Sequence, residues 1–339
     1  MSEQLSRGWQ RPSIYDVAKL AGVSHMTVSR VLNDHPNIRE STKERVLKAI
    51  DETNYTRSSI ARALATKRAM RIGVVVDNAS QYGPNSTLRA LENAARGEGY
   101  AISVFSALDD EALRIDAGVE DLVAQGVDAL CVIAPRLSSL DELRKHETGL
   151  PTLTIKSEPD ADMHTVGVDQ RAGAMLAMDH LLALGHTSIA HLAGPLDWYD
   201  ALARAEAWRE SLVNAGHAAV DRVLGDWTAD CGYEYGISHD FGDATAIFVA
   251  NDQMALGVLH GLNERGLRVP EDLSVVGFDD LPDSRHFLPP LTTVRQDFAA
   301  LGVLALQLIV AAIDDEPTPD YQTIEPRLVV RDSSAAPRA

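Results

Sequence analysis

The sequence predicts a small all-α domain at the N-terminus, followed by an α/β core that is large enough for two subdomains. Residues 13–33 hold two short helical patterns with a glycine between them. Residues 70–332 alternate strand-like apolar runs with helical stretches, a pattern typical of parallel sheets in an α/β fold. About 260 residues are enough for two such subdomains with sizeable hydrophobic cores.

The first of these stretches has the pattern of a helix-turn-helix. Ser13 is placed to cap the first helix, and Asp16 stands three positions later, where a capping box needs an acid. Gly22 follows where a helix end often needs a left-handed residue. Ser24 can then cap a second helix over residues 25–33. A helix held in this way has the size to enter the major groove of DNA.

The second helix separates inward-facing from outward-facing side chains. Its expected inward positions are Val28, Val31 and Leu32. Its outward positions in the first two turns are His25, Met26, Ser29 and Arg30. A recognition helix presents such early positions to base edges. The predicted DNA contacts of the whole head are Ser13, Tyr15, Ser24, His25, Met26, Thr27, Ser29, Arg30, Asn33 and Asn37.

A third helix is predicted to start at Ser41, with Glu44 as its capping-box partner. Its apolar positions are Val46, Leu47 and Ile50. A generic three-helix bundle without a DNA role is the alternative interpretation of this head.

The charge distribution favours the DNA-binding interpretation. Residues 1–71 hold 13 Lys and Arg against 7 Asp and Glu, whereas the rest of the chain holds 18 against 42. The head is therefore net +6 and the remainder net −24, which together give −18. A basic head on an acidic body is expected of a DNA-binding domain joined to another domain. Its cations would contact phosphates, so its affinity for DNA should fall with salt.

The segment after the head has the composition of a conditional hinge helix. Residues 58–69 combine an apolar face, which includes Ala61 and Leu64, with surrounding Arg and Lys side chains. Isolated helices shorter than about 12–15 residues are marginal in water. We therefore expect this segment to fold only against DNA and a second copy of the chain. Ala61 would permit close helix approach, and Leu64 would wedge between base steps in the minor groove. A plain interdomain linker is the alternative.

The body contains seven strand candidates, each followed by a turn or a helical pattern. They are Arg71–Asp77, Ala101–Phe105, Ala129–Ile133, Thr152–Lys156, Ile189–Gly194, Ala246–Ala250 and Leu273–Phe278. Two of the clearest helical patterns are Thr87–Glu98 and Ala172–Leu184. A cleft between two α/β lobes is a common place for a small ligand.

Several classes of protein are not supported by the sequence. It has no run of 18 apolar residues and no apolar signal region, which favours a cytoplasmic protein without a membrane role. Its two cysteines, Cys131 and Cys231, give no disulfide framework. No Walker loop, GxGxxG, GxSxG or HExxH motif is present. We therefore expect no catalytic residues, no metal site and no cofactor. The tail, Ser333–Ala339, has a composition typical of disorder.

Most of the chain contains long motifs that are characteristic of one family. In the head they are Ile14–Ala18, Ala21–Ser24, Thr27–Asn33 and Leu64–Ala65. In the body they are Leu192–Leu196, Gly225–Trp227, Val249–Gly257, Ser274–Asp280 and Pro289–Phe298. With these motifs the chain resembles the lactose-repressor/galactose-repressor family of bacterial transcription regulators, and most closely the lactose-repressor branch. The resemblance covers residues 13–331.

The resemblance implies a fold. The core would consist of two doubly wound subdomains, like those of periplasmic sugar-binding proteins, joined by three crossing segments near residues 167–169, 296–298 and 325–328. The implied divisions are a helix-turn-helix domain at 1–57, a hinge at 58–69, a core at 70–332 and a disordered tail at 333–339. Within the core, the N-subdomain would comprise 70–167 and 298–325, and the C-subdomain 168–297 and 326–332.

The resemblance also implies a ligand cleft between the subdomains. The matching positions are Asp200, Arg204, Trp227, Asn251, Asp279, Gln296, Phe298 and Lys156. Arg204 would place its planar donors on two neighbouring sugar oxygens. Asp279 would accept from an adjacent hydroxyl pair, or alternatively cap a helix. Trp227 and Phe298 would pack on the C–H face of a sugar; the alternative for Trp227 is a core residue.

Five positions depart from the lactose-repressor branch. Lys156 stands where that branch has an acid, and an ammonium cannot accept a hydrogen bond. It could instead donate to a sugar, pair with an acid or attract an anionic ligand. The position near Ile133 is apolar where the branch has an amide. Asp200 replaces a smaller neutral residue, and it could contact the ligand or simply pair with Arg204. His25 and Met26 replace a Tyr-Gln pair, so the operator should differ at the corresponding bases.

Taken together, these features predict a cytoplasmic, nucleoid-associated transcriptional repressor. A homodimer would bind double-stranded operator DNA, and a small sugar in the cleft would lower that affinity. A galactoside is the first expectation for the sugar, and another plant-derived glycoside the second. The absence of C-terminal heptads favours a dimer over a tetramer. A corepressor-dependent regulator of the same family is one alternative. A cytoplasmic sugar-binding protein without a DNA role, or a sugar-acting enzyme, is another.

Overall fold

The computed structural model consists of two compact units, Met1–Ala69 and Met70–Ala339. It describes residues 12–33, 35–55, 68–107, 115–133, 136–144, 148–160, 162–219 and 222–338. The predicted hinge helix, with Ala61 and Leu64, lies mostly outside the described residues. Within these ranges, no helix is long and apolar enough to cross a membrane.

The first unit is a helical head. Its helices are α1 (Ile14–Ala21), α2 (His25–Leu32) and α3 (Glu40–Thr53). Ser13 and Asp16 form the predicted capping box, in which the Asp16 amide donates to Ser13 Oγ at 3.4 Å and the Ser13 amide to Asp16 Oδ2 at 2.8 Å. Gly22 ends α1 with φ +66°, a left-handed conformation that glycine adopts at no steric cost. Ser24 caps α2 through the Thr27 amide at 3.1 Å.

The third helix differs from the prediction. It begins at Glu40 after Arg39, whose side chain makes no capping hydrogen bond, so the predicted start at Ser41 with a Glu44 capping box is wrong. Leu47 is also 46% exposed rather than inward-facing, whereas Val46 is fully buried. The backbone is extended at Arg39 and turns helical at Glu40, so the first turn of the helix forms before Ser41. The serine is therefore left inside the first turn.

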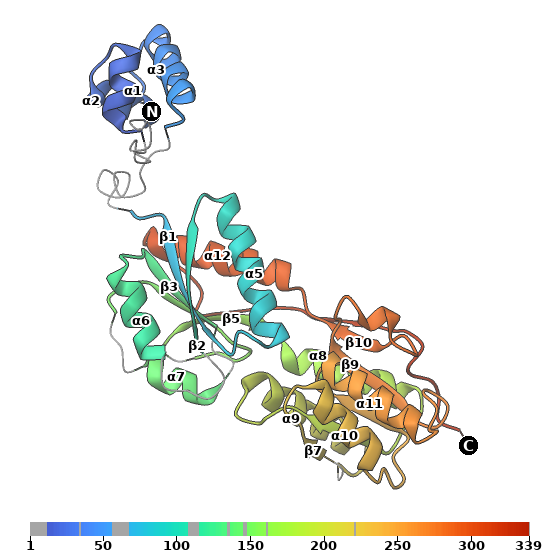
Figure 1. The fold of residues 1–339 in the computed structure, drawn as a ribbon. Helices are drawn as coiled ribbons and strands as arrows, with labels where there is room; N and C mark the ends of the chain where they lie inside the picture. The colour runs from blue at the N-terminus through green and yellow to red at the C-terminus, as the bar shows by residue number, and fades with distance from the viewer. Residues whose placement is uncertain are drawn as a thin grey trace, which may run out of the picture. The chain divides into compact units, whose positions relative to one another are not determined.

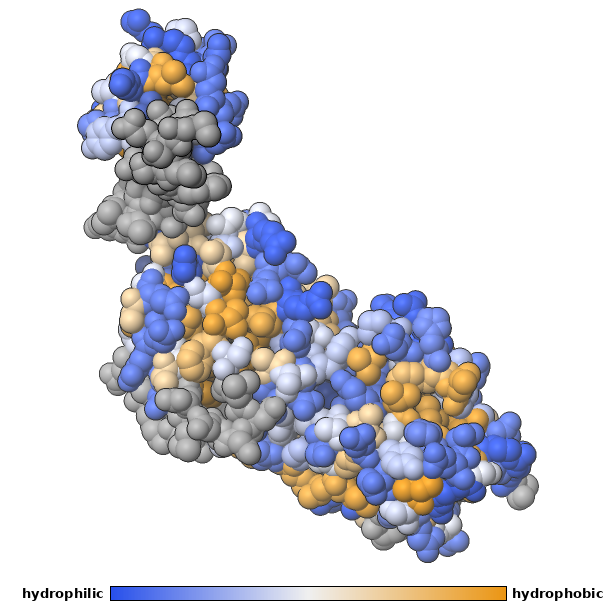
Figure 2. Space-filling view, viewed as in Figure 1, coloured by the Kyte–Doolittle hydropathy of each residue, from blue (hydrophilic) through white to orange (hydrophobic). Residues whose placement is uncertain are grey.

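The head has a small hydrophobic core of its own. The buried members are Val17, Ala18, Ala21, Val28, Val31, Val46 and Ala49. They come from all three helices. Core-facing positions at helical spacing on each helix therefore fix the angle at which α2 is presented. The visible surface of the head is mostly hydrophilic (Figure 2).

The second unit contains two mostly parallel sheets with helices on both faces (Figure 1). The strands of the first sheet are β1 (Arg71–Asp77), β2 (Ala101–Ala107), β3 (Ala129–Ile133), β4 (Thr152–Ile155), β5 (His164–Val168) and β11 (Tyr321–Ile324). Their order is β11-β5-β4-β3-β1-β2. The strands of the second sheet are β6 (Ile189–Ala193), β7 (Arg222–Leu224), β8 (Ala246–Val249), β9 (Ser274–Asp279), β10 (Thr292–Arg295) and β12 (Arg327–Val329). Their order is β12-β10-β9-β8-β6-β7, and β12 alone pairs antiparallel, with β10.

Each sheet is covered on both faces. On the first sheet, α5 (Tyr82–Gly97) and α12 (Phe298–Ile313) pack on one face. The opposite face is covered by α6 (Ile115–Ala124) and α7 (Leu137–Leu143). On the second sheet, α8 (Gln170–Ala183) and α9 (Tyr199–Asn214) cover one face, and α10 (Ala229–Ser238) and α11 (Asp252–Glu264) the other. A short 3₁₀ helix, η1 (Ser284–His286), follows β9. These layers explain why the central strands are buried along their whole length.

The chain passes between the two sheets three times. It leaves the first sheet after β5 and enters α8 at Gln170, returns between β10 and α12, and crosses again between β11 and β12. Each sheet is therefore assembled from segments that are distant in sequence. The carboxyl ends of β5, β9 and β10 meet the helices that start next to them, and this arrangement creates the cleft described below.

The fold class predicted from the sequence is confirmed, and each of the seven predicted strands lies within two residues of an observed one at either end. Five strands were not predicted, namely β5, β7, β10, β11 and β12. Most of these are short or lie at sheet edges, where part of the strand is exposed and the apolar signal is weak.

The C-terminal tail is ordered, so the predicted disorder of Ser333–Ala339 is wrong for its described part, residues 333–338. Ser333 is fully buried, and its hydroxyl donates to the Val275 carbonyl at 2.6 Å. The Ala335 carbonyl lies 2.8 Å from His186 Nε2. Arg338 reaches Asp272 at 3.2 Å. A serine hydroxyl, a backbone carbonyl and an arginine side chain form these bonds without any apolar pattern, which is why composition alone suggested disorder.

Candidate functional site

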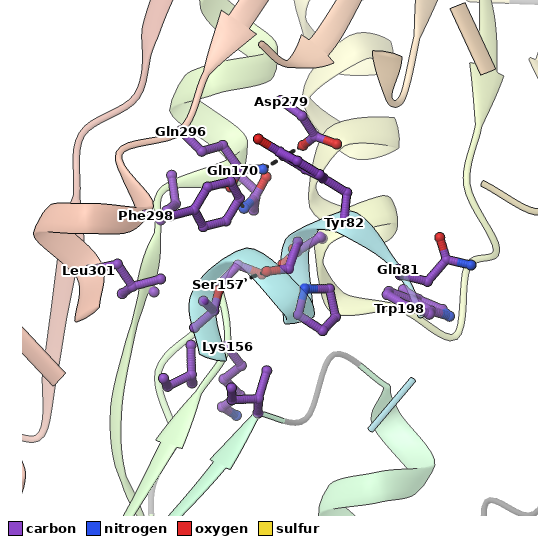
Figure 3. A pocket seen from close by; sticks show the side chains of 18 of the residues that line it. Gln81, Tyr82, Lys156, Ser157, Gln170, Trp198, Asp279, Gln296, Phe298 and Leu301 are labelled. Carbon is purple, nitrogen blue, oxygen red and sulfur yellow. Dashed lines mark hydrogen bonds between the residues drawn. The ribbon is translucent and has the colours of Figure 1, made fainter. Parts of the chain in front are cut away.

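A cavity lies between the two subdomains of the core (Figure 3). Together with the open solvent at its mouth, it comprises about 690 Å³ of empty space. All eight side chains predicted from the sequence line it, namely Lys156, Asp200, Arg204, Trp227, Asn251, Asp279, Gln296 and Phe298. The structure thus brings together residues from β4 to α12.

Hydrogen bonds hold the guanidinium of Arg204, a residue of α9, in one orientation at the cavity wall. Its Nε and Nη2 donate to Gln170 Oε1 at 2.9 and 2.8 Å, and its Nη1 donates to the Ala250 carbonyl. The guanidinium carbon stands 3.8 Å from the ring centre of Phe278. The side chain is 4% exposed, and two of its five N–H donors remain for other partners. Arg204 is therefore a fixed donor whose orientation does not depend on a ligand.

A hydrogen-bonded row continues from Arg204 to Asp279. Gln170 Nε2 donates to Gln296 Oε1 at 2.8 Å, and Gln296 Nε2 donates to Asp279 Oδ1 at 2.6 Å. Figure 3 shows Asp279, Gln296 and Gln170 grouped at one end of the cavity. Asp279 Oδ1 also lies 3.9 Å from Arg204 Nη2. Gln296, predicted as a further ligand contact, thus positions the carboxylate that a ligand would meet.

Burial raises the pKa of the Asp279 carboxyl to about 6, against the opposing effect of Arg204 and the Gln296 hydrogen bond. Asp279 ends β9 with φ +110°, so it does not cap a helix. Behind it, Asp252 is fully buried and accepts from the Thr293 hydroxyl at 2.6 Å and the Leu281 amide at 2.9 Å. Burial also raises the pKa of Asp252, and the charge of Asp279 adds to that effect. Two carboxylates therefore compete for ionisation at this end of the cavity.

Asp200 supplies a second carboxylate on the cavity wall. It stands in the first turn of α9, and its Oδ2 lies 3.9 Å from Arg204 Nη2. Burial raises the pKa of the Asp200 carboxyl, while Arg204 and the Ser157 hydroxyl act in the opposite direction. The separation of 3.9 Å exceeds that of a direct hydrogen bond. Arg204 therefore neutralises the two carboxylates only in part.

The aromatic and amide positions have distinct surroundings. Asn251 caps α11 by accepting from the Met254 amide at 2.9 Å, and its Nδ2 donates to the Trp227 carbonyl at 3.1 Å. Trp227 packs edge-on against Trp198, with ring centres 5.4 Å apart. No described residue accepts a hydrogen bond from its indole N–H. Asn251 thus holds the backbone of Trp227 in place beside the start of α11.

Lys156 lines the cavity with its alkyl chain, but its ammonium is engaged elsewhere. Nζ donates to Asp160 at 2.8 Å and lies 4.9 Å from the ring centre of Tyr199. Figure 3 shows its nitrogen pointing away from Asp279. Of the three roles considered from the sequence, the structure shows the pairing with an acid.

Several lining residues were not predicted. Among them are Gln81, Tyr82, Ser157, Gln170 and Trp198. Tyr82 packs edge-on against Phe298, with ring centres 5.8 Å apart. Trp198 adjoins the start of α9, which follows a predicted strand, and ligand-contacting side chains of parallel sheets gather at such positions. That signal was available for Trp198. Gln170 starts α8 after β5, a strand that was not predicted, and no local pattern marks Tyr82.

The head places most of its predicted DNA contacts on an accessible surface. Ser13, Tyr15, Ser24, His25, Met26, Arg30, Asn33 and Asn37 are exposed, and Thr27 and Ser29 are half-buried. The rings of Tyr15 and His25 meet with centres 5.0 Å apart, so α1 and α2 share this surface. Ala61 and Leu64 lie outside the described residues. The exposed start of α2 has the form of a recognition helix.

A helix-turn-helix head and a two-subdomain core with a polar cavity, combined in one chain, define a class of protein. That class is a DNA-binding regulator whose core binds a small ligand. Comparison with known proteins identifies the family within the class.

Residues 13–58 match the model for bacterial regulatory proteins of the lacI family, and residues 178–334 match that for the periplasmic binding protein-like domain. The lactose operon repressor of Escherichia coli (strain K12) is 34% identical over 329 residues, which cover 96% of this chain and 91% of that protein. The structure of the Lac repressor dimer bound to operator and the anti-inducer ONPF has a TM-score of 0.89 at 32% identity, covering 96% of this chain and 100% of the other. A cellobiose complex of the transcriptional regulator CelR has a TM-score of 0.70 at 30% identity, with coverages of 96% and 100%. The chain belongs to the LacI family and is a DNA-binding transcriptional repressor with a ligand-binding core, not an enzyme.

Proposed function

We propose that this repressor acts in the cytoplasm as a homodimer on a near-palindromic operator and that a small neutral sugar releases it. The observation that carries the proposal is the cavity itself. A fixed Arg204 stands between the carboxylates of Asp279 and Asp200, beside the aromatic faces of Trp227 and Phe298. Paired donors and acceptors beside aromatic faces suit a polyhydroxylated ring.

One similar structure supports the same ligand class. The CelR structure is described as a cellobiose complex. We expect a galactoside first and another glycoside second, because the core motifs are closest to the lactose-repressor branch. The ligand contacts both subdomains, so its binding changes their relative orientation and thereby operator affinity. Coupling of this kind is typically about 1–3 kcal/mol, or five- to 150-fold.

The head would read the operator with the start of α2. His25, Met26 and Arg30 are exposed there, and Ser29 is half-buried. Tyr15 extends the same surface from α1. Hinge residues Ala61 and Leu64 would contact the central minor groove of the operator, side by side in the two copies.

The test is a gel-shift measurement of operator binding at fixed salt, using the promoter beside the protein's own gene. Galactosides, glucosides and purines form the panel. Release by a galactoside or glucoside is the expected result. Tightening by a panel member would instead show a corepressor, and an absence of DNA binding would overturn the proposed role of the head.

A further inference from the structure

The charges around Arg204 are unbalanced. Asp200 and Asp279 each contribute a carboxylate, and Arg204 contributes one guanidinium that lies 3.9 Å from both. These three groups sum to one negative charge. The compensating positive charge belongs to a separate group, in which Lys156 and Arg144 both pair with Asp160, at 2.8 and 2.7 Å.

The Lys156 ammonium was the one feature that favoured an anionic ligand, and its ion pair with Asp160 makes it unavailable to such a ligand. The lysine side chain is 3% exposed and the Asp160 side chain 1% exposed. Arg144 also reaches Asp160, at 2.7 Å. An anion that recruited this ammonium would leave a buried carboxylate with only one cation, and breaking such a buried pair is costly.

Asp200 has acceptor capacity that the protein does not use fully. Its separation from Arg204 exceeds hydrogen-bond distance, and 30% of its side chain is exposed within the cavity wall. A carboxylate accepts hydrogen bonds and donates none. A matching ligand must therefore bring hydroxyl donors to Asp200 as well as to Asp279, one at each side of Arg204.

We infer that Asp200 is a specificity-determining residue, which makes the cavity select uncharged glycosides and reject their phosphorylated or carboxylated counterparts. This inference rests on the proposed sugar site and specifies its ligand class. A phosphate or carboxylate in the cavity would face both carboxylates, with a single guanidinium already shared between them. Two like charges a few ångströms apart in a protein environment change binding by roughly two orders of magnitude.

The experiment is calorimetric titration of the full chain without DNA. The probes are galactose, glucose and their methyl glycosides, each compared with the corresponding 6-phosphate and uronic acid. We expect an uncharged sugar to bind the wild-type protein at least about 100-fold more tightly than its charged counterparts.

Asp200→Asn keeps the side-chain shape and removes the charge. The affinity for the uncharged sugar should fall about tenfold, because charge-assisted hydrogen bonds are stronger than neutral ones. The preference over the 6-phosphate should fall by at least as much. Asp243→Asn is the matched control, since it removes one exposed carboxylate before β8, at the edge opposite the carboxyl ends of the strands. It should leave the preference unchanged.

The outcomes distinguish a failure of the proposed sugar site from a failure of the proposed role of Asp200. If the wild-type protein bound none of the sugars, charged or uncharged, the sugar assignment itself would fail and this inference with it. If it bound a sugar and its 6-phosphate equally, the sugar site would stand and the role of Asp200 would be overturned. An unchanged preference in Asp200→Asn would have the same consequence.

Discussion

Replacing Asp279 by asparagine should stabilise the core while impairing its response to the effector. Asp279 is 6% exposed, and burial raises the pKa of its carboxyl from 3.8 to about 6. Each pKa unit corresponds to about 1.36 kcal/mol, so the ionised carboxylate costs up to about 3 kcal/mol at pH 8. Asparagine avoids that cost, and its Oδ1 can still accept from Gln296.

The sign of the pH dependence follows from linkage. A carboxyl whose folded-state pKa is raised contributes stability that is fully present below 3.8 and lost as the pH rises through about 6. Asp279→Asn should therefore be more stable than wild type at pH 8 and equally stable near pH 3.8. For a core of this size the gain amounts to several degrees in Tm.

Asp280, which follows Asp279 in the chain, provides a control for which the expected change in stability has the opposite sign. Although burial alone would raise its pKa, hydrogen bonds from Arg331 and Arg295 hold the pKa of the Asp280 carboxyl below its usual value. Asp280→Asn should be destabilised at neutral pH, with a difference that shrinks as the pH falls. Thermal unfolding of both variants between pH 4 and 8 is the assay. A destabilised Asp279→Asn at pH 8 would refute the reasoning, because it would mean that the ion pair with Arg204 outweighs desolvation.

The other predictions concern the cavity, the head and the charge on the head. Arg204→Lys should weaken effector binding at least about 30-fold and leave operator binding intact, because lysine lacks the planar donors; a normal gel-shift response would contradict the cavity assignment. Gly194→Ala places a Cβ about 2.2 Å from the Trp227 ring, so sugar affinity by calorimetry should drop, and an unchanged value would mean that the ring position is unimportant. Val28→Ala removes fully buried methyl groups from the head and should cost roughly 2 kcal/mol; scanning calorimetry should show an earlier head transition and an unshifted core transition. The logarithm of the operator affinity should fall linearly with the logarithm of the salt concentration, and a flat dependence in gel shifts would argue against phosphate contacts by the basic head.

The helix-turn-helix could be predicted almost residue by residue, because its signals are local. Caps, the left-handed glycine and the apolar spacing act within a few residues of one another. The third helix shows the limit of such signals. Ser41 and Glu44 satisfy a capping-box pattern, yet the helix starts at Glu40, because the path of the preceding backbone decides where the first turn forms.

The sequence predicts which residues line the cavity but not the hydrogen bonds that connect them. Resemblance placed eight side chains around it, whereas sequence spacing says nothing of the row from Arg204 through Gln170 and Gln296 to Asp279. The role of Lys156 was left open, although its partner Asp160 stands only four residues later. Such a spacing is informative in a helix, but here it falls in a loop, where only tertiary structure brings the pair together.

The three chain segments that pass between the sheets determine how the core can respond mechanically. Two bodies tied together by several connections cannot slide apart, so their softest motion is a rotation about the connections. A molecule bound between the two subdomains limits that rotation. Its thickness determines the angle between the subdomains at which the rotation stops, and its length determines how far from the connections it acts. Effectors of different bulk should therefore produce different plateau levels of operator release, even when each is saturating.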